Sequence, residues 1–484
     1  MASSCNRCVI SASRAAAVQP QRFFAARQLV VASFSTSAIA LAGAKKGKPA
    51  KSPVKRQGGG FSKAKAGGAQ AKQKAEAAAL AVRADLIGPE PDLSGLHEFT
   101  NDVANEENVG RPTRFVKQRW DSISSFGLPK NIAKEFARDT PTTVVRESTV
   151  AVIERITKPT NQSSDSNRIL LSGARGCGKS TVMLQAVDSA MQNGSVVIYI
   201  PQAINLINSS SPFVYNSASQ MFHQPALSAQ LLQAMQSTNK SVLSSIKLSQ
   251  ETNIESTAAS GGSASFAAGD GLDKLIAAGA KSEALSVPVL EKALDILGSQ
   301  TDVNVLLAID EVQALFMTSE YRTPDYTLLE SYALSVPRLL LDYISGRKVL
   351  ARGTVLTSLS FSSPRYLPSL ELFTGLSDAL PSPVPLTPYD RVNEYHVAHA
   401  KGLKVVNVME KLALGEAQGM MSIWSKKGFV AHRKFAGMWR SYHKKLIAGV
   451  HPISATDELF LGKFAESGGN AREFGRGLFS TLAV

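Results

Sequence analysis

The stretch LLSGARGCGKSTVMLQAV, residues 170–187, decides the fold of this 484-residue chain. The apolar run RILLSG precedes Gly173-Ala-Arg-Gly-Cys-Gly178-Lys179-Ser180, which matches the phosphate-loop pattern GxxxxGK[ST], and the helix-forming run TVMLQAV follows. Glycines permit backbone angles that point successive N–H groups inward, and a helix N-terminus adds positive charge. A glycine turn without a ligand is the alternative, but the flanking strand and helix favour a phosphate-binding loop.

Nine consecutive residues of this loop are therefore candidate ligands of a nucleotide. Lys179 can reach the β- and γ-phosphates, and the hydroxyl of Ser180 suits Mg²⁺. The predicted phosphate contacts are Gly173, Ala174, Arg175, Gly176, Cys177, Gly178, Lys179, Ser180 and Thr181.

Two adjacent acidic residues end a second apolar run, VNVLLAID, residues 303–310. Asp310 is a predicted ligand of the Mg²⁺ shell. Glu311 resembles the second carboxylate of a Walker B pair, which polarises a water molecule for attack on the γ-phosphate. The alternative for both residues is that they cap the next helix, EVQALF. Any catalytic prediction therefore depends on Glu311.

Two further polar groups are candidate phosphate contacts. The predicted strand GTVLTSLS, residues 353–360, offers Thr357, Ser358 and Ser360, of which Ser360 is our predicted contact. Arg472 lies in SGGNAREFGRGL, residues 467–478, where it starts a helix that a small lid domain could swing over the phosphates. Structural roles remain the alternatives, because hydroxyls are ordinary in strands and exposed arginines are common.

Apolar runs and helix-forming stretches alternate through the middle of the chain. Runs at 195–201, 303–310 and 353–360 follow the strand before the loop, a pattern typical of a parallel sheet covered by helices on both faces. We predict an α/β fold of the AAA-like P-loop NTPase type over residues 166–375, with a disordered low-complexity insertion at 256–272. A helical segment at 96–165 is expected to precede this core, and a helical lid at 376–484 to follow it.

The net positive charge of the chain arises from its N-terminal end, because the basic and acidic residues of the rest balance. The formal net charge is +14, and residues 1–75 hold fourteen basic residues and no acidic one. Residues 1–45, rich in Ser and Ala with spaced arginines, are typical of a mitochondrial presequence; a secretory signal is the alternative. Residues 46–95 are a predicted disordered basic arm, either a linker or a segment that follows a phosphate backbone. No apolar run is long enough to predict a membrane span.

Several stretches together resemble a known family. YIPQAINLINSSSPFVYN with FHQPALSAQLLQAMQSTN (199–239), GTVLTSLS (353–360), YLPSLEL (366–372) and SGGNARE (467–473) are similar to the death-associated protein three family. Its members are P-loop proteins of the mitochondrial small ribosomal subunit. The resemblance covers residues 97–400 and 455–484. It implies an AAA-like domain in the head of the small subunit, GTP as nucleotide, small-subunit rRNA and ribosomal proteins as partners, and a monomer within the ribosome; contact with the large subunit is left open.

The residues alone leave the base undecided between GTP and ATP. The NKxD motif with which Ras-type GTPases select guanine is incomplete, because Ser and Val follow Asn239-Lys240. The Asp-Glu pair at the end of the second apolar run favours ATP. Glu311 also departs from animal members of the family, which lack an acidic residue there, so hydrolysis stays open for this chain.

A basic, aromatic stretch lies within residues 403–450, which we predict to be an insertion beyond the family's core. No acidic residue occurs between Glu416 and Asp457, and aromatic residues interleave with the cations. Cations neutralise phosphates and aromatic rings stack on unpaired bases, so we predict contact with RNA or ribosomal proteins. An amphipathic helical pair packed into the lid is the alternative. The predicted contact residues are Lys426, Lys427, Arg433, Lys434, Arg440, Lys444 and Lys445.

Three classes of function fit these features. The first is a structural ribosomal protein that keeps a purine nucleotide with Mg²⁺ as part of its fold and supports mitochondrial translation. The second is a working AAA-like ATPase or GTPase that uses Glu311 and Arg472. The third is an adaptor in cell-death signalling that is switched by its nucleotide. We expect the first function, with no hydrolysis or very slow hydrolysis.

Overall fold

The structure is a computed structural model, and all the residues that it describes lie within the unit Ala77–Val484. The described residues are 93, 95–136, 140–157, 162–256, 262–377, 379–380, 387, 389–427 and 457–480. The predicted presequence, almost all of the predicted basic arm and five of the predicted RNA-contact residues lie outside them. Those five are Arg433, Lys434, Arg440, Lys444 and Lys445.

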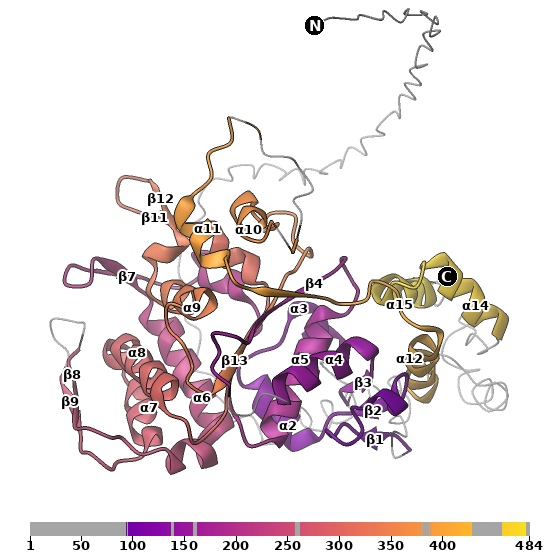
Figure 1. Cartoon of the computed structure of the whole chain (residues 1–484), viewed down its shortest axis with the longest axis horizontal. Coiled ribbons are helices and arrows are strands. Elements are labelled where there is room, and N and C mark those ends of the chain that lie inside the picture. Colours follow the sequence, from indigo (N-terminus) through magenta and orange to yellow (C-terminus); the bar gives the residue numbers. More distant parts are fainter. Residues whose placement is uncertain are drawn as a thin grey trace, which may run out of the picture. The chain divides into compact units, whose positions relative to one another are not determined.

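Five parallel strands form the central sheet (Figure 1). The strand that leads into the phosphate loop, β4, does not adjoin the strand that ends at Asp310, β10, because β13 lies between them. In spatial order the strands are β14 (Lys404–Asn407), β4 (Arg168–Ser172), β13 (Gly353–Ser358), β10 (Val305–Ile309) and β5 (Val196–Ile200). This arrangement confirms the predicted α/β fold of the P-loop NTPase type.

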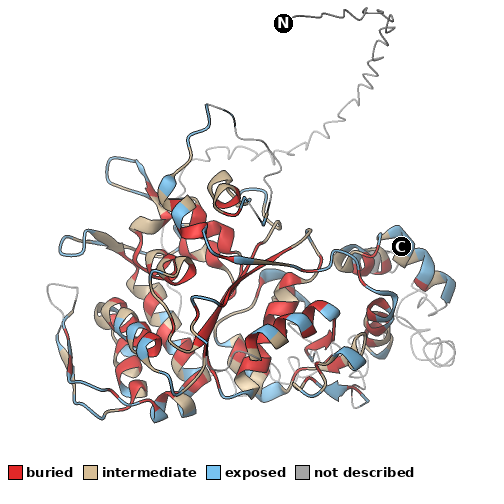
Figure 2. Cartoon of the chain, viewed as in Figure 1, coloured by how far each residue is buried: buried red, intermediate tan, exposed pale blue. Residues whose placement is uncertain are grey.

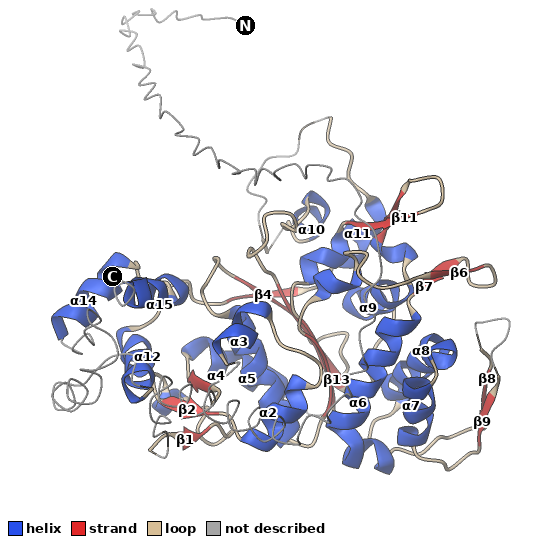
Figure 3. Cartoon of the chain, turned by 180° about the vertical axis from the view of Figure 1, so that it is seen from behind, coloured by secondary structure: helices blue, strands red, loops and turns tan. Residues whose placement is uncertain are grey.

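Helices cover both faces of the sheet (Figures 1 and 3). One apolar layer joins the sheet to helices α2–α5, and a second joins it to α6–α9. The helices of the first layer are α2 (Lys117–Ser124), α3 (Lys130–Glu135), α4 (Glu147–Thr157) and α5 (Lys179–Gln192). Those of the second are α6 (Pro225–Ser245), α7 (Leu272–Lys281), α8 (Glu283–Ser299) and α9 (Ser335–Ser345). None of the helices among the described residues is long and apolar enough to cross a bilayer.

The four strands β4, β5, β10 and β13 are buried along their whole length, and β5 and β10 are entirely apolar, because both faces of the sheet are covered (Figure 2). In β4, Leu170 belongs to the layer with α6–α9, whereas its neighbours Ile169 and Leu171 belong to the layer with α2–α5. Successive side chains of a strand point to opposite faces. A strand buried on both faces therefore appears in the sequence as a continuous apolar run, which is why the runs before Asp310 and before Pro201 were predictive.

Smaller elements flank the core. A three-stranded sheet precedes it: β1 (His97–Glu98), β2 (Pro112–Arg114) and β3 (Thr142–Val144). Three hairpins project from it: β6 (Val214–Asn216) with β7 (Met221–His223), β8 (Thr252–Ile254) with β9 (Ala264–Phe266), and β11 (Thr318–Arg322) with β12 (Leu328–Glu330). The remaining α-helices are α10 (Leu370–Gly375), α11 (Glu394–Ala400), α12 (Leu414–Lys426), α14 (Asp457–Glu466) and α15 (Ala471–Ser480). Short 3₁₀ turns are η1 (Glu106–Asn108), η2 (Ala203–Leu206), η3 (Val312–Phe316) and η4 (Ser331–Ala333).

The structure differs from the sequence-based predictions in three segments. Residues 96–165 contain the sheet β1–β3 as well as helices. The sequence did not predict this sheet, because strands of two or three residues are too short to show an alternating pattern. The predicted disordered insertion 256–272 includes β9, whose Phe266 packs on the core; residues 257–261 lie outside the described residues. The predicted insertion 403–450 begins with β14, which is the edge strand beside β4 and so belongs to the central sheet.

The other edge of the sheet is closed by a side chain. Asn239 lies in α6 at a kink, with φ −108° and ψ 17°, and is 3% exposed. Its Oδ1 accepts a hydrogen bond from Val197 N and its Nδ2 donates to Val197 O, both at 2.8 Å. These bonds satisfy the outward main-chain groups of Val197, which an edge strand would otherwise leave unpaired. Asn239 is therefore a structural residue.

Replacing Asn239 by Ala should lower the free energy of unfolding by about 2–3 kcal/mol, because the N–H and C=O of Val197 would stay buried without partners. Urea denaturation followed by circular dichroism measures this change. Lys240→Ala, on the exposed side of the same helix, is the matched control and should be close to neutral. Equal stability of the two variants would contradict the structural role of Asn239.

Candidate nucleotide site

The phosphate loop occupies the turn between β4 and α5, at the carboxyl edge of the sheet. Gly173, Gly176 and Gly178 have positive φ angles of 140°, 84° and 98°. A Cβ at Gly173 would lie 2.7 Å from Val408 O, and one at Gly176 would lie 2.7 Å from the Cβ of Arg472. Glycine is thus required twice over, by backbone angle and by close packing.

The side chain of Lys179 points back into the loop. It is 6% exposed, and its Nζ donates hydrogen bonds of 2.8 Å to the main-chain oxygens of Gly173 and Ala174. Burial lowers the pKa of Lys179, against the opposing effects of Cys177 and Asp310. Its ammonium group also lies 5.5 Å from the ring centroid of Phe361. A buried cation of this kind favours a neighbouring anion.

Asp310 supplies a buried carboxylate oxygen without a partner. The residue is 1% exposed, and its Oδ1 accepts a hydrogen bond of 2.9 Å from Glu311 N. Within the described part of the chain, neither Asp310 Oδ2 nor the hydroxyl of Ser358 has a hydrogen-bond partner. Burial raises the pKa of Asp310, and the nearby hydroxyls of Ser180 and Ser358 act in the opposite direction. Oxygen ligands of this kind fit Mg²⁺.

Glu311 has a strained backbone, and its carboxylate makes no hydrogen bond or ion pair with the residues that the structure describes. It lies in the left-handed region, with φ 60° and ψ 36°, at the N-terminus of η3, where its side chain makes no capping hydrogen bond. Burial, followed by the charge of Asp310, raises the pKa of Glu311 to about 7. Glu311 thus occupies the N-cap position of η3 without a capping hydrogen bond from its side chain, and a non-glycine residue held in this region suggests a functional constraint.

The C-terminal helices contact the loop directly. Asn470 Nδ2 donates to Arg175 O at 2.9 Å, and Arg472 N donates to Gly176 O at 3.2 Å. Burial, followed by the charges of Arg175 and Arg476, lowers the pKa of Arg472. Crowding of like charges beside a phosphate loop is what a polyphosphate would relieve. The structure thus brings the predicted residue Arg472 to the predicted loop.

Of the three hydroxyl residues predicted in the strand 353–360, Ser360 lies beyond the end of the strand. Ser360 follows the end of β13; its N–H donates to Gln313 Oε1 at 3.0 Å and its hydroxyl donates to Ser362 Oγ at 3.1 Å. Thr357 Oγ1 donates to Ile169 O and so has a structural role. Ser358 is the hydroxyl beside Asp310. A phosphate contact from Ser360 stays a prediction, and Ser358 is the better placed of the two for the metal.

A buried ion pair behind the loop is absent from the sequence predictions. The side chains of Arg146 and Glu416 are 8% and 4% exposed, and Arg146 Nε lies 3.1 Å from Glu416 Oε2. Arg146 Nη1 donates to Cys177 O inside the loop, and Nη2 donates to Met409 O at 3.2 Å. Glu416 also accepts from Glu147 N at 3.0 Å and Ala413 N at 3.2 Å. One guanidinium therefore joins the loop to segments on both sides of the core.

Two of the predicted RNA-contact lysines are within the described residues. Lys426 Nζ donates to Gly95 O at 3.1 Å, and Lys427 Nζ lies 5.1 Å from the ring centroid of Phe136. Both make contacts within the chain, in line with the packing alternative. Their contact with RNA stays a prediction.

Comparison with known proteins identifies the family. A family model described as mitochondrial ribosomal death-associated protein 3 matches residues 143–477. The chain belongs to this family. The resemblance inferred from residues 199–239, 353–372 and 467–473 is confirmed, and the protein is located in the mitochondrial ribosome. The span of the match includes β14 and α12, and the predicted insertion 403–450 stays a prediction.

Three relatives carry the name small ribosomal subunit protein mS29. The Schizosaccharomyces pombe protein is 26% identical over 323 residues, which are 66% of this chain and 65% of that protein. The Neurospora crassa protein is 25% identical over 361 residues, 71% of this chain and 73% of that protein. The Mus musculus protein is 27% identical over 240 residues, 47% of this chain and 60% of that protein. The chain thus spans slightly less than two thirds of the S. pombe and mouse proteins.

Replacing one partner of the buried ion pair should lower the free energy of unfolding more than replacing both partners together. Arg146→Met should lower the free energy of unfolding by about 3–5 kcal/mol, because Glu416 would remain as an unpaired buried charge. Arg146→Met combined with Glu416→Leu should be less destabilised than the sum of the single variants. Guanidinium denaturation measures the cycle, with Glu147→Gln, an exposed neighbour, as control. Strict additivity would show that the two side chains are not coupled.

Glu311 should make stability fall as the pH rises. The pKa of Glu311 is raised from 4.5 in the unfolded chain to about 7 in the folded one. The carboxyl group therefore stays protonated to higher pH in the folded protein, and the free energy of unfolding falls as the pH rises from 4.5 to about 7. Glu311→Gln removes the effect and should stabilise the nucleotide-free protein at pH 8 by roughly 1–3 kcal/mol relative to pH 5. Melting temperatures at both pH values measure this, with the exposed Glu107→Gln as control. If the melting temperatures of Glu311→Gln and wild type differ by the same amount at pH 5 and pH 8, the raised pKa of Glu311 is refuted.

Proposed function

We propose that this protein is a constituent of the small subunit of the mitochondrial ribosome that keeps a purine nucleotide with Mg²⁺ in the loop 173–181. The names of the three relatives support the first half of the proposal. The second half is carried by one observation. A glycine-rich loop encloses the buried Lys179 amino group, and the buried carboxylate of Asp310, whose Oδ2 has no well-aligned hydrogen bond among the described residues, lies beside the hydroxyls of Ser180 and Ser358.

Each residue of the site has a distinct task in this proposal. The main-chain N–H groups of 173–181 and the Lys179 ammonium group bind the phosphates, in a loop that positive φ angles at the glycines keep open. Ser180 and Asp310 would hold the Mg²⁺, which neutralises phosphate charge when it is bound. Arg472 approaches from α15 and adds a further positive charge.

The C-terminal helices favour retention of the nucleotide over turnover. Asn470 and Arg472 bond to the main chain of the loop, so α15 covers it as a lid. A lid held by hydrogen bonds slows exchange of the ligand. The ligand would stabilise the fold in return, by about 2.7 kcal/mol when its concentration is 100 times its dissociation constant.

GTP is proposed as the nucleotide through the family resemblance. Asn239, the residue that starts the incomplete NKxD motif, is engaged with Val197 at the sheet edge. Its side chain is therefore not available to recognise a base. The residues of the site do not discriminate between guanine and adenine, and ATP remains the alternative for the experiment below.

Nucleotide hydrolysis is the second candidate function, and one observation favours it. Glu311 has an unengaged carboxylate with a pKa of about 7, which suits a general base at neutral pH. In that case Glu311→Gln would abolish phosphate release while leaving nucleotide binding intact. The adaptor in cell-death signalling stays a prediction from the sequence.

Partners are proposed at the coarse level of rRNA and neighbouring small-subunit proteins, with the protein as a monomer within the ribosome. The basic residues at 426–445 and the basic arm 46–95 are the proposed RNA contacts. Contact with the large subunit is left open.

Native protein purified without added nucleotide should release one equivalent of GTP with Mg²⁺ on denaturation, identified by chromatography and mass spectrometry. Lys179→Ala should lose at least tenfold in nucleotide content, because the buried cation that faces the phosphates is gone. Arg472→Met should retain less nucleotide than wild type, because it removes a charge beside the loop.

Lys281→Met, which removes an exposed positive charge on α7, is the control for Arg472 and should retain the wild-type content. Circular dichroism separates loss of the ligand from loss of the fold. Full nucleotide content in folded Lys179→Ala would refute the site. Finding ATP in place of GTP would correct the base and leave the site intact.

A further inference from the structure

Two hairpins outside the nucleotide site expose an unusual concentration of apolar side chains. They are β6–β7 and β11–β12, which project side by side from the body of the molecule (Figures 1 and 3). Val214 and Tyr215 on the first are 59% and 54% exposed, and Tyr326 and Leu328 on the second are 80% and 49% exposed. A cluster of this kind on a soluble protein marks an interaction surface.

A groove of about 520 Å³ lies between the hairpins; we call it the hairpin groove. The rings of Phe213 and Phe222 (centroids 5.6 Å apart) line it, and Phe213 rests edge-on against the fully buried Tyr321 at 5.0 Å. Tyr215 extends this row, with its ring 5.1 Å from Phe222. The residues that line the hairpin groove are chiefly Phe213, Tyr215, Phe222, Arg322, Pro324 and Tyr326.

Tyr326 is held outward at an energetic cost. It has a positive φ of 62°, which is rare for an aromatic residue. The turn is fixed by hydrogen bonds of 2.9 Å from Tyr326 N to Thr323 O and from Arg322 Nη1 to Tyr326 O. Strain and exposure of a large aromatic ring both disfavour this arrangement in the isolated protein, so the ring serves something other than stability.

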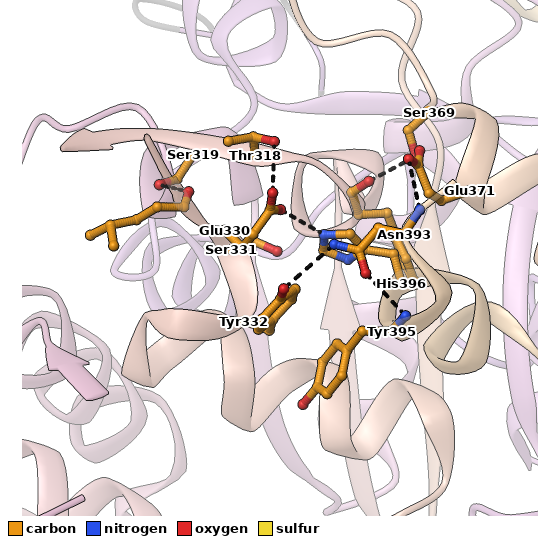
Figure 4. Close-up of polar contacts among 12 residues, drawn as sticks. Thr318, Ser319, Glu330, Ser331, Tyr332, Ser369, Glu371, Asn393, Tyr395 and His396 are labelled. Atoms are coloured by element: carbon orange, nitrogen blue, oxygen red, sulfur yellow. Dashed lines mark hydrogen bonds and ion pairs between the residues drawn. The ribbon is translucent and has the colours of Figure 1, made fainter. Parts of the chain in front are cut away.

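The base of the second hairpin is fixed to the core (Figure 4). Glu330 Oε1 accepts a hydrogen bond of 3.2 Å from Thr318, and Glu330 Oε2 lies 3.2 Å from His396 Nε2 on α11. The contact with His396 lowers the pKa of Glu330. Ser319 Oγ donates to Leu329 O across the strands. The groove is therefore formed before any partner binds, which reduces the ordering cost of association.

The charges around the groove favour a protein partner over RNA. Residues 213–222 include no Asp, Glu, Lys or Arg. On the second hairpin, Glu320 is paired with Arg365 at 3.0 Å and Glu330 contacts His396. The two other charged residues of this hairpin, Arg322 and Asp325, have opposite charges, so their sum is zero. Binding to a phosphate backbone requires an excess of positive charge, and this surface has none.

The main chain of β6 indicates how a partner segment would bind. Within the described residues, β6 pairs with β7 alone, while β7 has a further bridge from Phe222 to Leu334. The second edge of β6 is thus open to an extended segment, a common mode of peptide recognition. Val214 and Tyr215 lie on this strand next to the groove.

We propose that the hairpin groove binds an extended, uncharged segment of a neighbouring protein of the ribosome, which pairs with the edge of β6 and inserts an aromatic or aliphatic side chain between Tyr215 and Tyr326. This docking surface is separate from the loop 173–181, so its test does not depend on nucleotide binding.

Site-specific photocrosslinking in the assembled small subunit tests the proposal. Benzoylphenylalanine replaces Tyr215 or Tyr326 in turn, and Leu461 on α14, which is 53% exposed, serves as the control position. Positions 215 and 326 should crosslink to one and the same protein segment, in products that resist ribonuclease, and position 461 should not. Crosslinks to rRNA, to a second copy of this chain, to two unrelated proteins or to nothing would each overturn the proposal.

A binding measurement then tests the chemistry. A synthetic peptide of the crosslinked segment should bind the full-length protein, and Tyr215→Ser with Tyr326→Ser should weaken binding at least tenfold. Leu461→Ser should bind like the wild type. Melting temperatures should match among all three proteins, because the replaced side chains are exposed. Undiminished binding by the double variant, with an unchanged melting temperature, would refute the groove as the docking site.

Discussion

The guanidinium of Arg146 is the contact on which the conformation of the loop 173–181 depends. It bonds to the carbonyl of Cys177 inside the loop, to Glu416 in the first turn of α12 and to the carbonyl of Met409. A buried charge of this kind is tolerated only when every donor has a partner. The conformation of the loop therefore depends on segments before and after the core, so the proposed nucleotide binding would depend on both.

The lid approaches the same loop from its outer side. Asn470 and Arg472 bond to the carbonyls of Arg175 and Gly176, while Arg146 contacts the following residue from behind. A loop held on two sides has little freedom to open and close rapidly. This is the physical basis for proposing a retained nucleotide in a ribosomal protein. Glu311, with its unengaged carboxylate, is the feature that keeps hydrolysis as a second candidate.

The nucleotide site and the hairpin groove are joined by a short piece of chain. Glu311 follows β10 and is succeeded by η3, whose residues are all buried, and the chain then enters β11 of the second hairpin. The core thus presents two surfaces of different chemistry. One is a polar, positively charged loop suited to phosphates, and the other is an aromatic groove of balanced charge suited to a protein segment.

Local patterns in the sequence were enough to predict the α/β class, the glycine-rich turn between β4 and α5, and the position of Asp310 at the end of a buried strand. Glycine spacing and apolar runs are fixed by backbone angles and by burial on both faces of a sheet. Tertiary structure alone decided what those residues meet. Arg146 and Glu416 are 270 positions apart, Ser358 rather than Ser360 lies beside Asp310, and Asn239 turned out to close a sheet edge. The short strand β14 joined the sheet without a recognisable apolar run. Contacts between distant segments depend on how the layers pack, and no local pattern encodes that packing.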